Sequence, residues 1–104
     1  MISEAIATAA FCASIGGVEE TRHNYPGGYV KVDCETSKYV IEAGLDKRSS
    51  LDSIQQAVFF SILTGKKPII VIYDTDGKDG KYEYRIKSVA DKLGIIFISW
   101  DVTS

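Results

Sequence analysis

Cysteine and histidine are scarce in this chain, with Cys12, Cys34 and His23 as their only examples. Two cysteines do not make a disulfide scaffold, and no Cys/His pair has the spacing of zinc ligands, which excludes both of those small-domain classes. The first residues lack the basic region of a signal peptide, and no apolar run approaches the about 20 residues of a membrane span. We therefore expect a cytoplasmic protein with reduced thiols and no membrane association.

Basic residues are not in excess either, since 12 Lys and Arg stand against 14 Asp and Glu, for a net charge of −2. A dedicated nucleic-acid-binding module is strongly basic, so the composition does not indicate that class. Any action on phosphates then requires a local basic face, a metal ion or a partner chain. The chain length of 104 residues suits one domain, which we expect to span residues 1–104.

The hydrophobic pattern and the turn signals predict eight elements. Helices are expected at 2–15, 51–64 and 82–93, and strands at 18–25, 29–35, 39–45, 68–73 and 95–100. Ser3 is placed to cap the first helix. The first three strands follow one another through short turns, which favours antiparallel pairing, and the last two arrive through helical crossovers. The order predicts an α/β fold, a mixed central sheet with helices on both faces.

Two carboxylates are expected to meet on neighbouring strands. In residues 29–35, strict alternation places Val30, Val32 and Cys34 on one face and Asp33 on the other. If the following turn centres near residue 37, Asp33 lies opposite or diagonal to Glu42, with Cβ atoms about 5 Å apart. Two carboxylates this close repel unless a cation lies between them, and hard oxygen ligands suit Mg²⁺ or Mn²⁺.

The same residues carry a resemblance to a known family. Residues 30–33 (VKVD) and 40–42 (VIE) resemble the two carboxylate-bearing strands of the PD-(D/E)XK, or restriction-endonuclease-like, nucleases. Residues 53–60 (SIQQAVFF) resemble the Gln-bearing helix found in several branches of that family. The resemblance covers about residues 4–73 and implies a restriction-endonuclease-like αβββαβ core, to which the last helix and strand are an addition.

The resemblance also implies site residues and a function. Asp33 and Glu42 would hold Mg²⁺ or Mn²⁺, Glu4 would add a third acidic ligand, and Gln56 would position a site residue or a phosphate. The family places a lysine two residues after the glutamate, where this chain has Gly44, and Lys47 is its substitute. The implied function is metal-dependent hydrolysis of phosphodiester bonds in DNA, and the small size of the domain makes a homodimer plausible.

Other interpretations of the sequence remain open. Because Gly44 replaces the expected lysine and the pI is near 5.3, the chain is alternatively a non-catalytic module of the same fold that binds protein or nucleic acid. A third option is a small α/β regulatory subunit with its site at residues 74–76, although an Asp- and Gly-rich turn explains that loop more simply. His23 is expected to be structural or exposed. The tyrosines can stack on bases, and the Lys and Arg residues at 22, 31, 47, 48, 66 and 67 are candidates for a basic rim.

Overall fold

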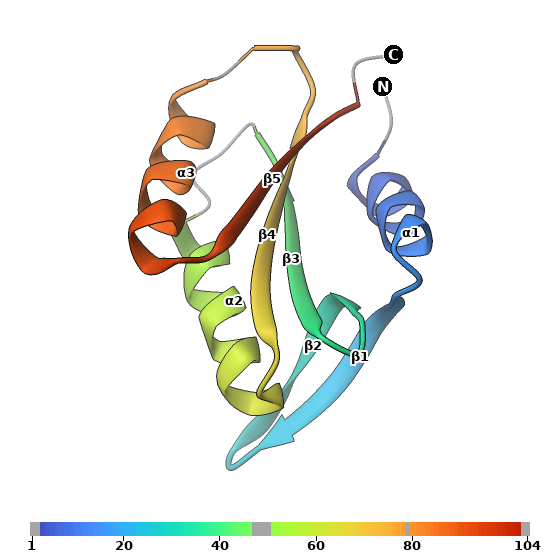
Figure 1. Ribbon diagram of the computed structural model, residues 1–104. Helices are drawn as coiled ribbons and strands as arrows, with labels where there is room; N and C mark the ends of the chain where they lie inside the picture. The colour runs from blue at the N-terminus through green and yellow to red at the C-terminus, as the bar shows by residue number, and fades with distance from the viewer. Residues whose placement is uncertain (1–2, 47–50, 79, 103–104) are drawn as a thin grey trace.

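The computed structural model describes residues 3–46, 51–78 and 80–102 (Figure 1). In chain order its elements are α1 (Glu4–Ser14), β1 (Val18–Tyr25), β2 (Gly28–Glu35), β3 (Tyr39–Leu45), α2 (Leu51–Thr64), β4 (Lys67–Asp74), α3 (Lys81–Leu93) and β5 (Ile96–Asp101). All eight predicted elements are present, and their bounds differ from the predicted ones by no more than two residues.

The five strands form one open sheet in the order β1-β2-β3-β4-β5. The first three strands pair in antiparallel fashion, whereas β3, β4 and β5 are parallel to one another. This arrangement follows from the connections, because tight turns link the first three strands and helices link the last three. The predicted α/β fold with a mixed sheet is therefore confirmed.

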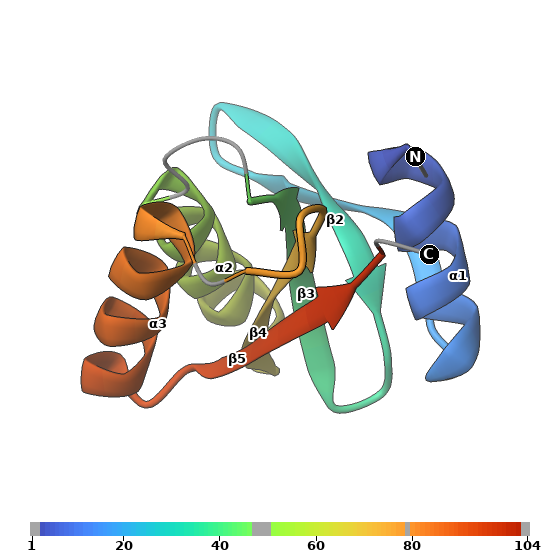
Figure 2. The same ribbon diagram turned by 90° about the horizontal axis from the view of Figure 1, so that it is seen from above.

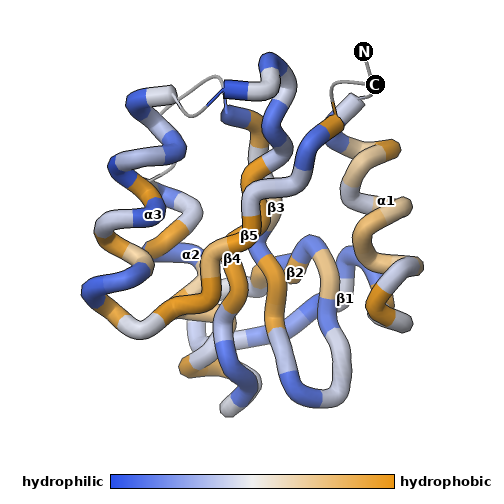
Figure 3. The backbone as a smooth tube through the Cα atoms, turned by 45° about the horizontal axis from the view of Figure 1, so that its top comes forward, coloured by the Kyte–Doolittle hydropathy of each residue, from blue (hydrophilic) through white to orange (hydrophobic). Residues whose placement is uncertain are grey.

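Helices cover both faces of the sheet (Figure 2). Helix α1 lies on one face, and α2 and α3 lie together on the other. The Ser3 hydroxyl accepts a hydrogen bond from the Ile6 amide at 3.2 Å and caps α1 as predicted. Hydrophobic residues concentrate along β3 and β4 in the middle of the sheet (Figure 3). None of the described helices combines the length and the apolar character that crossing a membrane requires.

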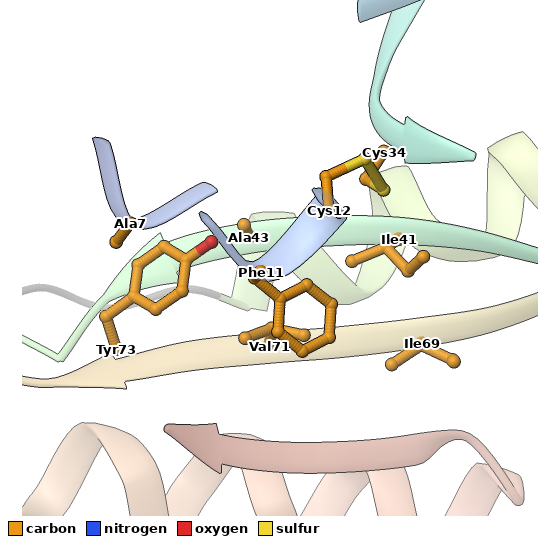
Figure 4. Close-up of a cluster of buried hydrophobic side chains, with 9 residues drawn as sticks. All are labelled: Ala7, Phe11, Cys12, Cys34, Ile41, Ala43, Ile69, Val71 and Tyr73. Atoms are coloured by element: carbon orange, nitrogen blue, oxygen red, sulfur yellow. A yellow bond between two sulfur atoms is a disulfide. The ribbon is translucent and has the colours of Figure 1, made fainter. Parts of the chain in front are cut away.

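A disulfide joins α1 to the sheet and corrects the expectation of reduced thiols. Cys12, in the last turn of α1, is bonded to Cys34, near the end of β2 (Figure 4). Both residues are fully buried in the core beneath α1, where they pack with Phe11 and Ile41. A Cβ atom at Gly17 would lie 2.8 Å from Cys12 Sγ and closer still to Cys34 Sγ, so only glycine fits there. Sequence spacing missed the bond because the two cysteines meet only when α1 packs on β2.

The ladder between β1 and β2 is interrupted at one position. Val32 and Cys34 of β2 both pair with β1 residues in one constant register, but Asp33 between them does not. On β1, Glu20 would be its partner, and Glu20 has a φ of 53°, a left-handed conformation that is uncommon for residues other than glycine. The regular pairing of the two strands is therefore broken at the level of Asp33.

The interruption changes which side chains share a face. Val32 packs with Phe60 of α2 on one side of the sheet, whereas Cys34 is bonded to Cys12 of α1 on the other. The strict alternation predicted for residues 29–35 is therefore wrong at this point. A continuous pleat would have placed Val32 and Cys34 on the same face.

Candidate functional site

An acidic hollow of about 310 Å³ opens beside the interruption in β2. Its lining combines the first two turns of α1 with the parts of β1, β2 and β3 that face them. Five of the lining residues are acidic, and the full set is Glu4, Ala5, Thr8, Glu19, Glu20, Asp33, Glu42 and Ala43. The structure therefore brings Asp33, Glu42 and Glu4, the three predicted metal ligands, to the lining of one hollow.

Glu42 is a buried residue of this hollow, and Asp33 beside it is half-buried. Pairing between β2 and β3 covers only Cys34 and Glu35 of β2, so the ladder ends just before Asp33. The Asp33 carboxylate replaces the next ladder bond, because its Oδ2 accepts a hydrogen bond from the Ala43 amide at 2.9 Å. The Asp33 and Glu42 side chains are close enough for each to shift the pKa of the other. The predicted approach of these two carboxyl groups is present, although a side chain rather than a regular ladder produces it.

Burial and like charge together change the acidity of this pair. Desolvation, followed by repulsion from Asp33, raises the pKa of Glu42 to about 9, and the charge of Glu4 adds to the effect. Desolvation also raises the pKa of Asp33. Two neighbouring carboxyl groups in a buried site cannot both ionise at low cost, so the pair retains a proton at neutral pH.

Helix α1 is held over the hollow by a hydrogen bond to the sheet. The Tyr73 hydroxyl of β4 donates to Thr8 Oγ1 of α1 at 2.8 Å. Burial raises the pKa of Tyr73 to about 12, so this hydroxyl stays protonated as a donor. Glu4 lies in the first turn of α1, where an acidic residue is also favoured by the helix dipole.

Of the other predicted site residues, Gln56 is not brought to the hollow. Gln56 is an exposed residue of α2 and lines a separate hollow together with Val30 and Phe59. Lys47, the predicted substitute for the missing lysine, lies outside the described residues. At the buried Gly44, the usual lysine position, a Cβ atom would meet nothing closer than 3.9 Å, so a Cβ atom fits there.

Sequence reasoning missed two acidic residues of the hollow, Glu19 and Glu20. Both are exposed residues of β1 and lie next to each other, a pattern that by itself indicates only a solvated strand edge. The left-handed conformation of Glu20 could not be predicted either, because glutamate is not a residue type that favours it. Their presence makes the hollow more acidic than the predicted ligand set implied.

A second acidic cluster lies where β3 and β4 end and α3 begins. Four residues each place one carboxylate oxygen within 4.8 Å of the others, and such a grouping can hold a metal ion. They are Asp46, Asp74, Asp76 and Glu83. No other group of three or more such ligands was found in the described part of the chain. These carboxylates also hold the loop together, since Asp46 accepts from the Thr75 amide at 2.9 Å and Asp74 from the Gly77 amide at 2.8 Å.

His23 belongs to a third polar cluster, centred on Glu35. His23 Nε2 lies 2.6 Å from Glu35 Oε1, and Lys66 Nζ lies 2.5 Å from Glu35 Oε2. Thr21 Oγ1 donates a further bond to Glu35. Although burial alone would raise it, these bonds lower the pKa of Glu35 to about 2. The prediction that His23 has a structural role is consistent with this network, which ties β1 and β2 to the start of β4.

Comparison with protein-family models, with curated proteins and with solved structures finds no match for this chain.

Proposed function

We propose that this protein is a metal-dependent phosphodiesterase of nucleic acids with a PD-(D/E)XK-like arrangement. The observation that carries the proposal is the buried Asp33–Glu42 pair at the point where β2 separates from β3. Two carboxyl groups this close must either retain a proton, as this pair does without a ligand, or take up a cation between them. Their position on the second and third strands of an αβββαβ order is the one that the family resemblance implies.

The donor set fits a hard divalent cation. Asp33 and Glu42 offer carboxylate oxygens, the ligands preferred by Mg²⁺ and Mn²⁺. Glu4 also lines the hollow, but its carboxylate does not lie within 4.8 Å of both of theirs. Such an ion would supply Lewis acidity toward a phosphodiester and a water molecule. The chain itself would contribute the Asp33–Glu42 pair and, through the Thr8–Tyr73 hydrogen bond, a fixed position of α1. The acidic lining would repel anions until a cation is bound.

One observation favours a second candidate, a non-catalytic binding module of the same fold. Among the described residues that line the hollow there is no lysine or arginine, whereas the family uses a lysine to assist the attacking water. Gly44 occupies the expected position of that lysine, and Lys47 lies outside the described residues. DNA as substrate, the homodimer and the cytoplasmic location remain predictions from the sequence.

Calorimetric titration with MnCl₂ and MgCl₂, followed by a cleavage assay on labelled DNA, tests the proposal. Wild type should bind one ion in the hollow, and Asp33→Asn and Glu42→Gln should each abolish binding and cleavage. These substitutions keep the side-chain size, and the side-chain oxygen that Asp33→Asn retains can still accept from the Ala43 amide. Asp76→Asn in the second acidic cluster is the matched control and should leave both properties unchanged.

Three other outcomes are informative. Binding that is lost in Asp76→Asn but kept in Asp33→Asn would place the ion in the second cluster and contradict the proposal. Binding in the hollow without cleavage of any nucleic acid would favour the non-catalytic module. No binding in wild type, with or without DNA present, would contradict a metal-dependent function at Asp33 and Glu42.

A further inference from the structure

The outer half of the β1–β2 hairpin presents an exposed basic and aromatic surface, which we call the hairpin platform. The strand register places Arg22 opposite Lys31 and Asn24 opposite Tyr29. Residues two apart on a strand, or opposite each other across two strands, share a face. All four side chains are exposed to solvent. This half of the hairpin projects beyond the end of β3 (Figure 1).

The platform faces away from α2. The alternate hairpin side chains point toward the helix, since the Tyr25 ring packs edge-on against Phe59 of α2 with centroids 5.3 Å apart. His23, also on that side, is bonded to Glu35. Arg22, Asn24 and Tyr29 lie on the opposite face, whereas Lys31 also borders the hollow that Gln56 and Phe59 of α2 line.

The platform is arranged to receive an anion and a planar ring. Arg22 and Lys31 are like charges directly across a strand pair, an arrangement that is unfavourable without a counter-charge. Neither forms an ion pair with a carboxylate in the part of the chain that the structure describes. The Arg22 guanidinium lies 3.9 Å from the centre of the Tyr29 ring, and its Nε donates to Asn24 Oδ1 at 3.3 Å. Tyr29 is nevertheless 50 % exposed, which leaves ring surface for another planar group.

The platform continues directly from the acidic hollow. Lys31 is two residues from Asp33 on β2, or about 7 Å along the strand, and Tyr29 is four residues away, or about 13 Å. A chain of phosphates that reaches Asp33 would therefore pass the Arg22–Lys31 pair next and Tyr29 after it. The net charge of −2 makes such a local basic surface necessary for binding a polyanion.

We propose that the hairpin platform binds an unpaired nucleic-acid strand that leads into the acidic hollow. This inference rests on the proposed function and specifies its substrate class. A base can stack on the free surface of Tyr29 only if it is not stacked within a duplex. The Arg22–Lys31 pair can contact the phosphates of one strand. The platform has no second pair of cations to contact the phosphates of a complementary strand. Single-stranded DNA and single-stranded RNA share this chemistry.

Fluorescence anisotropy with a short labelled oligothymidine, in EDTA at low salt, tests the platform without depending on the metal. Wild type should bind it, and Arg22→Gln/Lys31→Gln should weaken binding at least tenfold. The slope of log K against log salt should fall by about 1.4, because two phosphate contacts to a single strand are lost. Tyr29→Ala should weaken binding about fivefold or more through the lost stacking. Arg85→Gln/Lys92→Gln, which removes the same charges from exposed positions of α3, is the control and should match wild type.

The outcomes separate this inference from the proposed function. Equal losses in the platform and α3 variants, or tighter binding to a duplex of the same length, would overturn the platform even if Mn²⁺ binds at Asp33 and Glu42. Failure of wild type to bind any single strand in EDTA would also overturn it. Loss confined to the platform variants would support it even if the metal titration failed. Oligouridine and the corresponding oligothymidine, compared side by side, distinguish RNA from DNA as the preferred strand.

Discussion

Glu35 receives three side-chain donors and is the most strongly ionised carboxylate of the described residues. Because the pKa of Glu35 is lowered to about 2 from its usual 4.5, its bonds stabilise the folded state fully above about pH 4.5. That contribution is lost as the pH falls toward 2. Removing the strongest donor by Lys66→Gln should lower the free energy of unfolding at neutral pH by about 1–3 kcal/mol, the usual value of a hydrogen bond to a charged group. Urea denaturation between pH 2 and 7 measures the effect.

The adjacent exposed residue Lys67 provides the control. Lys67→Gln removes the same charge one position along the chain, and it should change stability by less than about 0.5 kcal/mol, as surface substitutions usually do. The difference between the two variants should narrow as the pH falls. A difference that stays constant from pH 7 to pH 2 would show that Lys66 stabilises the protein without involving the charge of Glu35.

The residues of the candidate site were predictable to different degrees. Asp33 and Glu42 were found from the sequence because two strands joined by a short turn bring such positions together whatever the details of the ladder. Glu20 was not found, since it lies on an exposed strand and no residue type in the sequence signals its left-handed backbone conformation. Gln56 was assigned to the site by resemblance alone, and its position on the exposed side of α2 separates it from the acidic hollow.

At the scale of elements, the sequence predicted all eight helices and strands because their signals are local. Gly16, Gly65 and Gly94 end the three helices in left-handed conformations that favour glycine. The interruption of the β1–β2 ladder and the bond between α1 and β2 were not predictable in this way. Both depend on how separate elements pack, and the strand pattern around Asp33 is as regular in sequence as an uninterrupted strand.

The disulfide between α1 and β2 gives a prediction about this pair of elements. Cys12 and Cys34 are separated by 22 residues, and a cross-link over a loop of that length stabilises the folded state by about 3 kcal/mol. Cys12→Ala/Cys34→Ala should lower the free energy of unfolding by this amount in guanidinium denaturation. It should also weaken Mn²⁺ binding, because α1 carries Glu4 and is less firmly held.

Wild type that is unfolded, reduced and then refolded under reducing conditions should have the same free energy of unfolding as the double variant. Reductant should not change the free energy of unfolding of the double variant. Two reactive thiols in unfolded, unreduced wild type would contradict the bond. Disulfides are typical of oxidising compartments. Confirmation of the bond would therefore count against the cytoplasmic location predicted from the sequence.

For the whole molecule, the proposed metal site predicts that stability depends on the metal. An ion that binds only the folded protein stabilises it by about 2.7 kcal/mol at a free concentration 100-fold above Kd. For a domain of this size that corresponds to a rise in Tm of roughly 10–20 °C. Differential scanning fluorimetry of wild type with and without MnCl₂ should show this rise. Asp33→Asn/Glu42→Gln should show none.

The same double variant should be at least as stable as wild type when no metal is present. It removes two desolvated carboxyl groups that raise each other's pKa, while amide groups of the same size can still hydrogen-bond to one another and to Ala43. Functional sites commonly reduce stability in this way, because the geometry that binds a ligand is unfavourable without it. A double variant that unfolds well below metal-free wild type would instead show that the carboxyl pair is a structural link between β2 and β3, and the case for a metal site would lose its main support.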